Sequence, residues 1–275
     1  MGRISALTEL TSLASDDYLV VLDSSANIAK KITVANAFGI TDLGWTASGE
    51  SWTYASWTST TRIGTITVPT DATTKYVAGM RIKITQSTGG TKYGIITEVA
   101  ATLLTIFFPT GTTLNNEAIT SPQYSLAKSP SGFDLDPTVW TLEYTRTTQD
   151  TQASPTANTW YKLNASDELV LGIGLWYAGY SVGHFAAKAA GGLDFETTLS
   201  TSSSSETDST MTARTQSSGA TPTQLIDPIV KTRILAVTSQ TTYHLISETR
   251  SASHTDLGHD NDDQTLKIWA TCAYL

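Results

Sequence analysis

The sequence predicts an all-β protein, and three observations support this prediction. β-Branched and aromatic residues recur in short alternating segments, a pattern typical of strands. Helix-favouring runs are almost absent, and only 15% of the residues are charged. The chain has 275 residues, more than one ordinary domain, so we expect two compact β domains after an N-terminal arm. The predicted boundaries are residues 1–43 for the attachment arm, 44–133 for a small β-barrel and 134–275 for a C-terminal β-sandwich.

The arm is expected to form one β-hairpin. Residues 18–23 make the first strand, residues 24–27 a polar turn, and residues 28–34 a second strand. Because a lone two-stranded hairpin is marginal in water, we expect another protein to complete it. The alternative is a frayed terminus or an intramolecular edge strand. The residues predicted to make the attachment are Ile4, Leu7, Asp17, Tyr18, Leu19, Val20, Val21, Leu22, Lys31, Ile32 and Val34.

The second region, residues 44–133, reads as a small β-barrel. Its predicted strands cover residues 51–54, 61–68, 81–86, 91–99, 103–108 and 123–126. Gly89-Gly90 is its clearest hairpin signal. Its aromatic residues, among them Trp45, Trp52 and Trp57, could stack against sugar rings, but core packing is the better interpretation.

The third region, residues 134–275, reads as a β-sandwich of the jelly-roll type. It contains about nine alternating segments joined by polar turns, as such sandwiches do. The predicted strands cover residues 140–148, 159–163, 168–176, 179–186, 193–200, 210–215, 230–239, 243–250 and 265–274.

Three motifs of the arm resemble an N-terminal segment of known families. They are Ile4-Ser5-Ala6-Leu7, Asp16-Asp17-Tyr18-Leu19-Val20-Val21-Leu22-Asp23 and Lys30-Lys31-Ile32-Thr33-Val34. The pattern is similar to that of many tailed-bacteriophage fibre, spike and head-decoration proteins. In those families the segment lies at the virion-proximal end. The resemblance therefore implies a virion component, made in the bacterial cytoplasm, whose partners are capsid or tail proteins.

Later motifs also resemble phage modules. Lys92-Tyr93-Gly94-Ile95-Ile96 and Pro130-Ser131-Gly132-Phe133 look like parts of a small β-barrel found in phage structural proteins. Residues 176–182 and 266–275 are similar in layout to the tumour-necrosis-factor and C1q-like heads of phage fibres. Those heads are typically trimers. The resemblance thus implies a homotrimer whose interface contains Trp269, Tyr274 and Leu275.

Composition and motifs argue against several function classes. No nucleophile elbow, P-loop, His-Glu-x-x-His helix or dinucleotide fingerprint occurs, so we expect no enzymatic activity and no cofactor. The formal charge of −8 leaves no basic stripe for nucleic acid. No stretch approaches the ~20 apolar residues of a membrane span, so we expect no membrane insertion. The single cysteine, Cys272, is expected to be a buried small hydrophobe.

One polar run near the C-terminus is a candidate metal site. His254, Asp256 and His259 could bind Zn²⁺ or Ni²⁺, and the nearby carboxylates Asp260, Asp262 and Asp263 could bind Ca²⁺. The run lacks the fixed spacing of a known metal loop. A solvated turn between the last two strands is the favoured alternative, and no metal is expected.

Two functions follow from the sequence. The first is a non-enzymatic bacteriophage structural protein, a trimeric capsid decoration, head fibre or short spike, whose distal head can contact the host surface. The alternative is a tail-fibre or baseplate receptor-binding protein that recognises host glycans. A small glycan-processing enzyme is the third hypothesis, and it lacks an acid and base pair.

Overall fold

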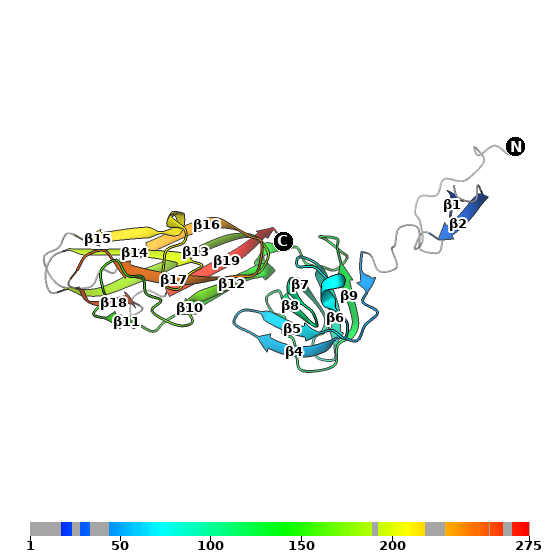
Figure 1. The fold of residues 1–275 in the computed structure, drawn as a ribbon, viewed down its shortest axis with the longest axis horizontal. Coiled ribbons are helices and arrows are strands. Elements are labelled where there is room, and N and C mark those ends of the chain that lie inside the picture. The colour runs from blue at the N-terminus through cyan, green and yellow to red at the C-terminus, as the bar shows by residue number, and fades with distance from the viewer. Residues whose placement is uncertain are drawn as a thin grey trace.

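The computed structural model describes residues 18–23, 28–33, 44–188, 192–217, 229–252, 254–260 and 266–274 (Figure 1). Apart from short 3₁₀ turns, its regular elements in these ranges are antiparallel strands. The predicted all-β class is therefore confirmed. None of the described elements is a helix long and apolar enough to cross a lipid bilayer.

The predicted N-terminal hairpin is present. Strand β1 (Tyr18–Asp23) pairs antiparallel with β2 (Ile28–Thr33), in a register that runs from Tyr18 opposite Thr33 to Asp23 opposite Ile28. Figure 1 shows these strands apart from the two larger β regions. Four residues predicted to make the attachment lie outside the described residues, namely Ile4, Leu7, Asp17 and Val34.

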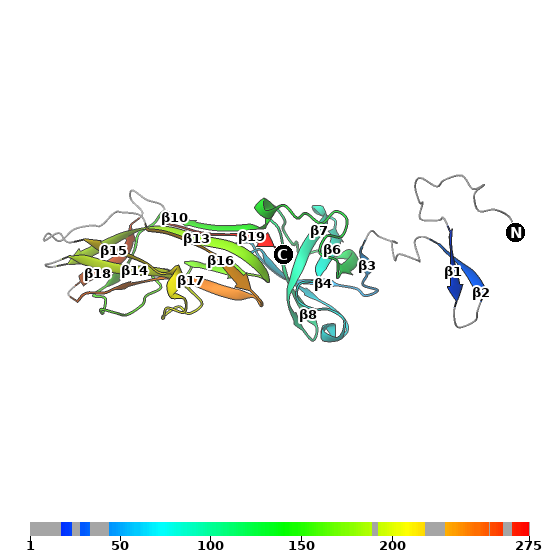
Figure 2. The same ribbon diagram turned by 90° about the horizontal axis from the view of Figure 1, so that it is seen from above.

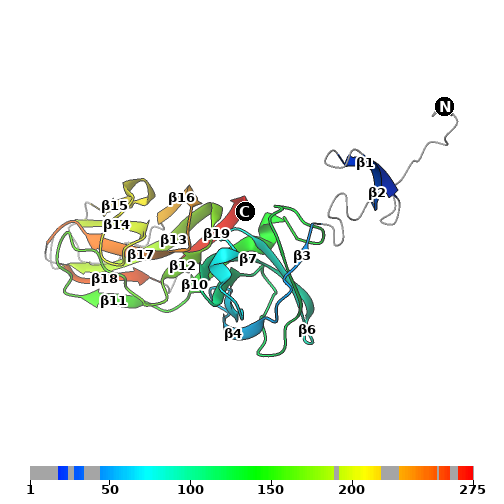
Figure 3. The same ribbon diagram turned by 45° about the vertical axis from the view of Figure 1, so that its right-hand side comes forward.

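The second region forms a sheet that curls into a half-barrel (Figure 3). Its core follows the strand period of two, since β-branched residues of each strand alternate between a buried and a less buried face. Gly89 and Gly90, with φ of 80° and 64°, form the predicted hairpin turn. In pairing order, the strands are β3 (Thr46–Ala47), β9 (Thr120–Ser125), β6 (Arg81–Gln86), β7 (Gly90–Ala100), β8 (Leu103–Phe107), β5 (Ile63–Thr67) and β4 (Thr53–Thr58).

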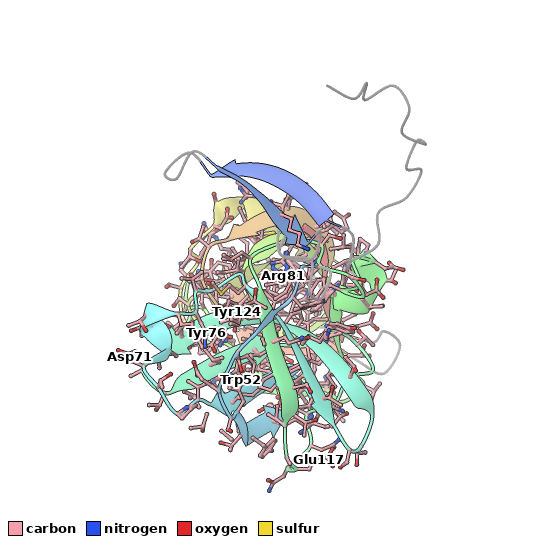
Figure 4. The ribbon with its side chains drawn as sticks, turned by 90° about the vertical axis from the view of Figure 1, so that its right-hand side faces the viewer. Trp52, Asp71, Tyr76, Arg81, Glu117 and Tyr124 are labelled. Atoms are coloured by element: carbon pink, nitrogen blue, oxygen red, sulfur yellow. The ribbon has the colours of Figure 1, made fainter. Side chains whose placement is uncertain are left out.

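Aromatic side chains fill the half-barrel rather than line a groove. Trp45 and Trp52 are 3% and 2% exposed, so these two pack as predicted. Trp52 and Tyr124 each meet Tyr76 edge to face, with ring centroids 5.6 and 5.3 Å apart (Figure 4). Such edge-to-face pairs stabilise a core beyond the area that they bury.

The third region is a two-sheet sandwich, as Figure 2 shows from above. One sheet has the order β10-β19-β13-β18-β11, with β16 also paired to β13. Its strands are β10 (Thr141–Arg146), β11 (Asp150–Ala153), β13 (Gly174–Lys188), β16 (Ile229–Val237), β18 (His254–Asp260) and β19 (Leu266–Tyr274). The other sheet has the order β12-β17-β14-β15. Its strands are β12 (Glu168–Leu171), β14 (Leu193–Ser200), β15 (Ala213–Ser217) and β17 (Thr241–Thr249).

Several predictions about the sandwich are wrong. Residues 159–163 make only an isolated bridge, from Tyr161 to Ser247, and residues 168–176 divide between β12 and β13, which lie in different sheets. Residues 254–260 are not a solvated turn but strand β18, in which His254 and His259 are 5% and 0% exposed. Strand β11, which pairs with β18, was not predicted at all. Polar residues dominate both strands, so the alternation that reveals other strands is missing here. The buried ring of His259 is held by contacts with Arg146 and Ser247.

The half-barrel has a hydrophobic core of its own, and a second buried cluster joins it to the sandwich. Phe107 of β8 lies 5.7 Å, between ring centroids, from both Trp140 and Trp176 of the sandwich region. Phe133 stacks on Trp140, with ring centroids 5.4 Å apart. All four rings belong to a single buried cluster. The predicted division at residue 133 remains a prediction; residues 134–138 are exposed, but the buried rings of Phe133 and Trp140 on either side of them belong to the same cluster.

Arg62 ties the two regions together. It is 8% exposed, adopts a φ of 54° and lies over the Phe107 ring at 5.0 Å. Its guanidinium donates to Val139 O at 3.1 Å and Thr141 O at 2.5 Å, both beyond the predicted boundary. Burial lowers the pKa of Arg62 to about 10, so the group is cationic at neutral pH.

Replacing Arg62 should destabilise the half-barrel and the sandwich together. Arg62→Met removes charged donors from two carbonyls in a region that water reaches poorly, so we expect the free energy of unfolding to fall by roughly 2–3 kcal/mol. Urea denaturation followed by tryptophan fluorescence measures this loss. Arg214→Met is the control, because Arg214 is 47% exposed and pairs with Asp194 at the surface, where a change below ~1 kcal/mol is expected. Equal losses in the two variants would contradict a bracing role for Arg62.

Candidate functional site

A chain of buried polar side chains crosses the interior of the sandwich. Arg146, at the end of β10, lies 3.3 Å from the Asp167 carboxylate, which precedes β12. A second Arg146 contact is the ion pair with Asp150 of β11. Arg146 also lies 3.0 Å from Nδ1 of His259 on β18. Arg146 is 5% exposed, and Asp167 and His259 are 0% exposed.

The chain continues from His259 to the opposite sheet. His259 Nε2 lies 3.0 Å from Ser247 Oγ, and Ser247 Oγ lies 2.7 Å from Thr197 Oγ1. Thr197 Oγ1 lies 2.5 Å from His184 Nε2. Because guanidinium N–H groups only donate, Nδ1 of a neutral His259 accepts from Arg146, and its Nε2–H donates to Ser247. The proton order is thus set from Arg146 as far as Ser247; between Ser247 and Thr197 either hydroxyl can donate.

Burial keeps both histidines neutral. The pKa of His184 falls to about 3, because burial disfavours its cation and His259 lies nearby. Burial also lowers the pKa of His259; Arg146 adds to this effect, while Asp167 opposes it. The pKa of Arg146 is itself lowered by burial and raised in part by Asp167. If His259 were protonated, its Nδ1–H would point at the N–H groups of Arg146, and two donors cannot bond to each other. The neutral imidazole is therefore the form that fits.

Asp167, His259 and Ser247 have the composition of a hydrolytic triad but not its chemistry. A triad histidine donates from Nδ1 to the acid and takes the serine proton at Nε2. In this chain Nδ1 accepts from Arg146, so Nε2 already carries a proton. Ser247 is also 0% exposed, so no substrate can reach it. This network is structural, and the sequence offered no signal for it because its members lie far apart in the chain.

Two of the candidate metal ligands, His254 and His259, have separate partners, and Asp262 and Asp263 lie outside the described residues. His259 contacts Arg146 and Ser247, whereas His254 Nδ1 lies 2.9 Å from Ser251 O and its ring lies 5.6 Å from that of Phe195. Across the parts of the chain that the structure describes, no three His, Cys, Asp or Glu side chains are arranged to hold a metal ion.

The outer face of the sheet that contains β13 and β16 is apolar and exposed. Tyr177 of β13 is 46% exposed and lies opposite Ile234 of β16, which is 57% exposed. Val230 lies four residues before Ile234 in β16, on the same face, and is 58% exposed. Trp269 of β19 is half-buried, and its ring occupies the space beside Gly179, where a Cβ would come within 2.8 Å of it. Contiguous exposed apolar side chains of this kind mark interaction surfaces.

This face continues into an apolar cleft at the junction of the two regions. The cleft has a volume of about 630 Å³. Leu175 and Ala236 line it and continue the outward-facing positions of Tyr177 and Ile234. On the half-barrel side its wall includes Val77 and Leu126, which are 54% and 77% exposed.

A second, polar hollow lies at the other end of the half-barrel. Figure 4 shows Arg81, which lines the apolar cleft, and Glu117, which braces the hollow, far apart. The hollow has a volume of about 340 Å³, and Lys92 lies in its wall. The buried Gln86 amide holds its two loops together, donating to Asn115 O at 2.7 Å and accepting from Asn115 N at 3.1 Å. The remaining lining residues are Thr88, Gly89, Thr91, Gly111, Thr112 and Thr113.

The structure places one of the three predicted trimer residues. Trp269 lies on the apolar outer face, and its place in a trimer interface stays a prediction. Leu275 and the side chain of Tyr274 lie outside the described part. Sequence reasoning missed Tyr177, Val230 and Ile234, because alternation predicts strands but does not tell which face of a strand is covered.

Comparisons with known proteins give no family. No family model matches the sequence, and no curated protein matches it. Among solved structures, the chain is similar to that of the infectious bursal disease virus Gx strain, with 12% identity and a TM-score of 0.30 over 94% of this chain and 68% of that chain. It is also similar to the VP2 subviral particle of the same virus, with 12% identity and a TM-score of 0.27 over 93% and 68%. TM-scores this low carry no argument about function.

Proposed function

We propose that this chain is a non-enzymatic structural protein of a bacteriophage particle, a homotrimeric capsid decoration, head fibre or short spike. The observation that carries the proposal is the exposed apolar face of β13, β16 and β19 with the adjoining cleft. Covering that exposed apolar surface would stabilise the protein, because apolar side chains would leave water. A second copy of the chain covers it in a homotrimer, with Trp269 at the interface.

The N-terminal hairpin supports the structural role. Strands β1 and β2 form a two-stranded sheet, which is marginal by itself and gains stability when a partner adds strands or an apolar surface. The motifs in these strands resemble phage attachment segments. A capsid or tail protein is the partner that the proposal assigns to them.

Three of the described sites offer no catalytic pair, whereas another hollow, of about 280 Å³, holds two carboxylates, Glu143 and Glu168, each paired with a lysine. The triad-like set of Asp167, His259 and Ser247 is buried. His259 carries its proton on Nε2, so it cannot act as a general base toward Ser247. The apolar cleft is lined by Arg81 and Lys128 but by no carboxylate, and the polar hollow by Lys92 alone among ionisable groups. Neither therefore offers an acid and base pair.

Two measurements test the proposal. Light scattering of the intact, folded chain should give three times the mass of one chain; a monomeric mass would contradict the trimer. Deleting residues 1–40 should leave a folded, soluble trimer that no longer incorporates into particles, as electron microscopy of labelled virions would show. Incorporation that survives the deletion would contradict the attachment role of the hairpin.

One observation favours the alternative, a tail-fibre or baseplate protein that recognises host glycans. The polar hollow is pre-organised and offers threonine hydroxyls, an amide and the Lys92 ammonium, groups that hydrogen-bond to sugars. Its lining has no aromatic ring for a sugar face to stack on, so binding would be weak. Saturable adsorption of the purified chain to host cells, lost in Lys92→Met, would favour this alternative.

A further inference from the structure

An exposed leucine between two aspartates stands out at the domain junction. Leu135 is 51% exposed although large apolar side chains are usually covered. Asp134 and Asp136 on either side of it are also exposed. The three residues, which we name the acidic knob, connect Phe133 to the 3₁₀ turn η3 (Pro137–Trp140).

The acidic knob is rigid. Asp134 O accepts from Trp140 Nε1 at 2.8 Å, and Asp134 Oδ1 accepts from the backbone N–H of Asp136 at 2.8 Å. Asp136 caps η3, accepting from Thr138 N at 2.9 Å. The buried stack of Phe133 on Trp140 fixes both ends of the segment. A side chain held out in this way loses little conformational freedom when it docks.

The apolar cleft has the complementary chemistry. The chain carries a net charge of −8, yet the charged residues that line the cleft are Arg81 and Lys128, both cations. Its remaining wall is largely aliphatic, including Val77, Leu126 and Leu175. A volume of about 630 Å³ is within the range of sites that enclose a ligand group, and a leucine side chain fits easily.

The knob and the cleft both lie at the junction of the half-barrel and the sandwich. Leu135 does not line its own chain's cleft, although Phe133 lies beneath the Arg81 guanidinium at 5.4 Å. The knob therefore begins one residue after a ring that packs against a residue of the cleft wall. A contact between unlike surfaces of two copies is heterologous, and it forms a closed ring when the rotation from copy to copy completes a full turn.

We propose that the occupant of the cleft is the acidic knob of a second copy of this chain. Leu135 enters the apolar part, and Asp134 and Asp136 face Arg81 and Lys128. The contact runs from each copy to the next and closes after three copies. The inference rests on the proposed function, because it specifies how the homotrimer is held together; the outer-face residues Tyr177 and Ile234 lie beside the cleft and complete the interface.

Cross-linking tests the contact directly. In the full-length chain carrying Leu135→Cys and Val77→Cys, a short bismaleimide should join copies and yield a covalent trimer as the largest product. Native Cys272 adds little background, because it is 2% exposed and burial raises its pKa to about 12. The control is a chain that carries Val77→Cys and Thr255→Cys. Thr255 is an exposed residue of β18, and this variant should give no cross-linked dimer or trimer.

Point variants separate this contact from trimer formation itself. Leu135→Asp should raise the concentration at which the trimer dissociates by ~30-fold, and Leu135→Met should leave it nearly unchanged. If the wild type is a trimer but neither cross-links form nor Leu135→Asp weakens it, the knob contact is wrong and the trimer stands. If the wild type is a monomer by light scattering, both the contact and the trimer are wrong.

Discussion

Arg146→Met should lower the free energy of unfolding by about 3–5 kcal/mol. The substitution leaves the Asp167 carboxylate, which is 0% exposed, without the guanidinium 3.3 Å away. An isolated buried charge costs far more than a broken surface pair. His259 also loses the donor at its Nδ1 atom. Urea denaturation at pH 7.5, monitored by far-UV circular dichroism, measures the loss.

Two further variants separate charge burial from simple loss of an ion pair. Lys267→Met breaks the Lys267–Glu143 pair, whose side chains are 43% and 49% exposed, and should cost less than ~1 kcal/mol. Combining Arg146→Met with Asp167→Leu removes both buried charges and should recover much of the stability. A double variant less stable than Arg146→Met alone would show that the pair is not the source of the effect.

Acid should destabilise the sandwich well above the pH at which its carboxylates protonate. The pKa of His184 is about 3 in the fold against an ordinary 6.5, and that of His259 is also lowered. Between these values the unfolded chain binds more protons than the folded chain. The histidine contribution is therefore fully present above pH 6.5 and is lost as the pH falls from 6.5 toward 3. The slope should approach ~1.4 kcal/mol per pH unit for each histidine.

Denaturation curves at pH 7.5, 6.0 and 5.0 check this dependence. Surface carboxylates with lowered pKa values, such as Asp194 and Asp208, contribute at still lower pH. Burial raises the pKa of Glu248, whose protonation opposes the histidine slope, so a histidine variant is needed to isolate the effect. His184→Gln retains a polar group beside Thr197 but does not titrate, and it should flatten the slope. An unchanged slope in His184→Gln, or equal stability at pH 7.5 and 5.0, would contradict the neutral buried pair.

Strands whose pattern is local were predicted closely from the sequence. The bounds of β6, residues 81–86, and of β14, residues 193–200, are those predicted, because alternating side chains and flanking turns define these strands without distant partners. Strand β18 was misread as a turn for the opposite reason. Its polar side chains look solvated until β13, Arg146 and Ser247 surround them.

The candidate surface depended even more on tertiary structure. The sequence suggested Trp269 through a resemblance, yet Tyr177 and Ile234 became candidates only when β13 and β16 paired and left one face uncovered. In the sequence, Asp134 and Asp136 indicated only a boundary between two regions. The fold turned them into a rigid acidic knob and placed a cationic, apolar cleft at the same junction.

The sequence by itself determined the all-β class, the arm hairpin and most strands, since these depend on a period of two and on turn residues that act locally. The tertiary structure decided what is buried and what is left exposed. Residues as distant as Arg146 and His259, or Tyr177 and Ile234, meet only when long-range strand pairing brings them together.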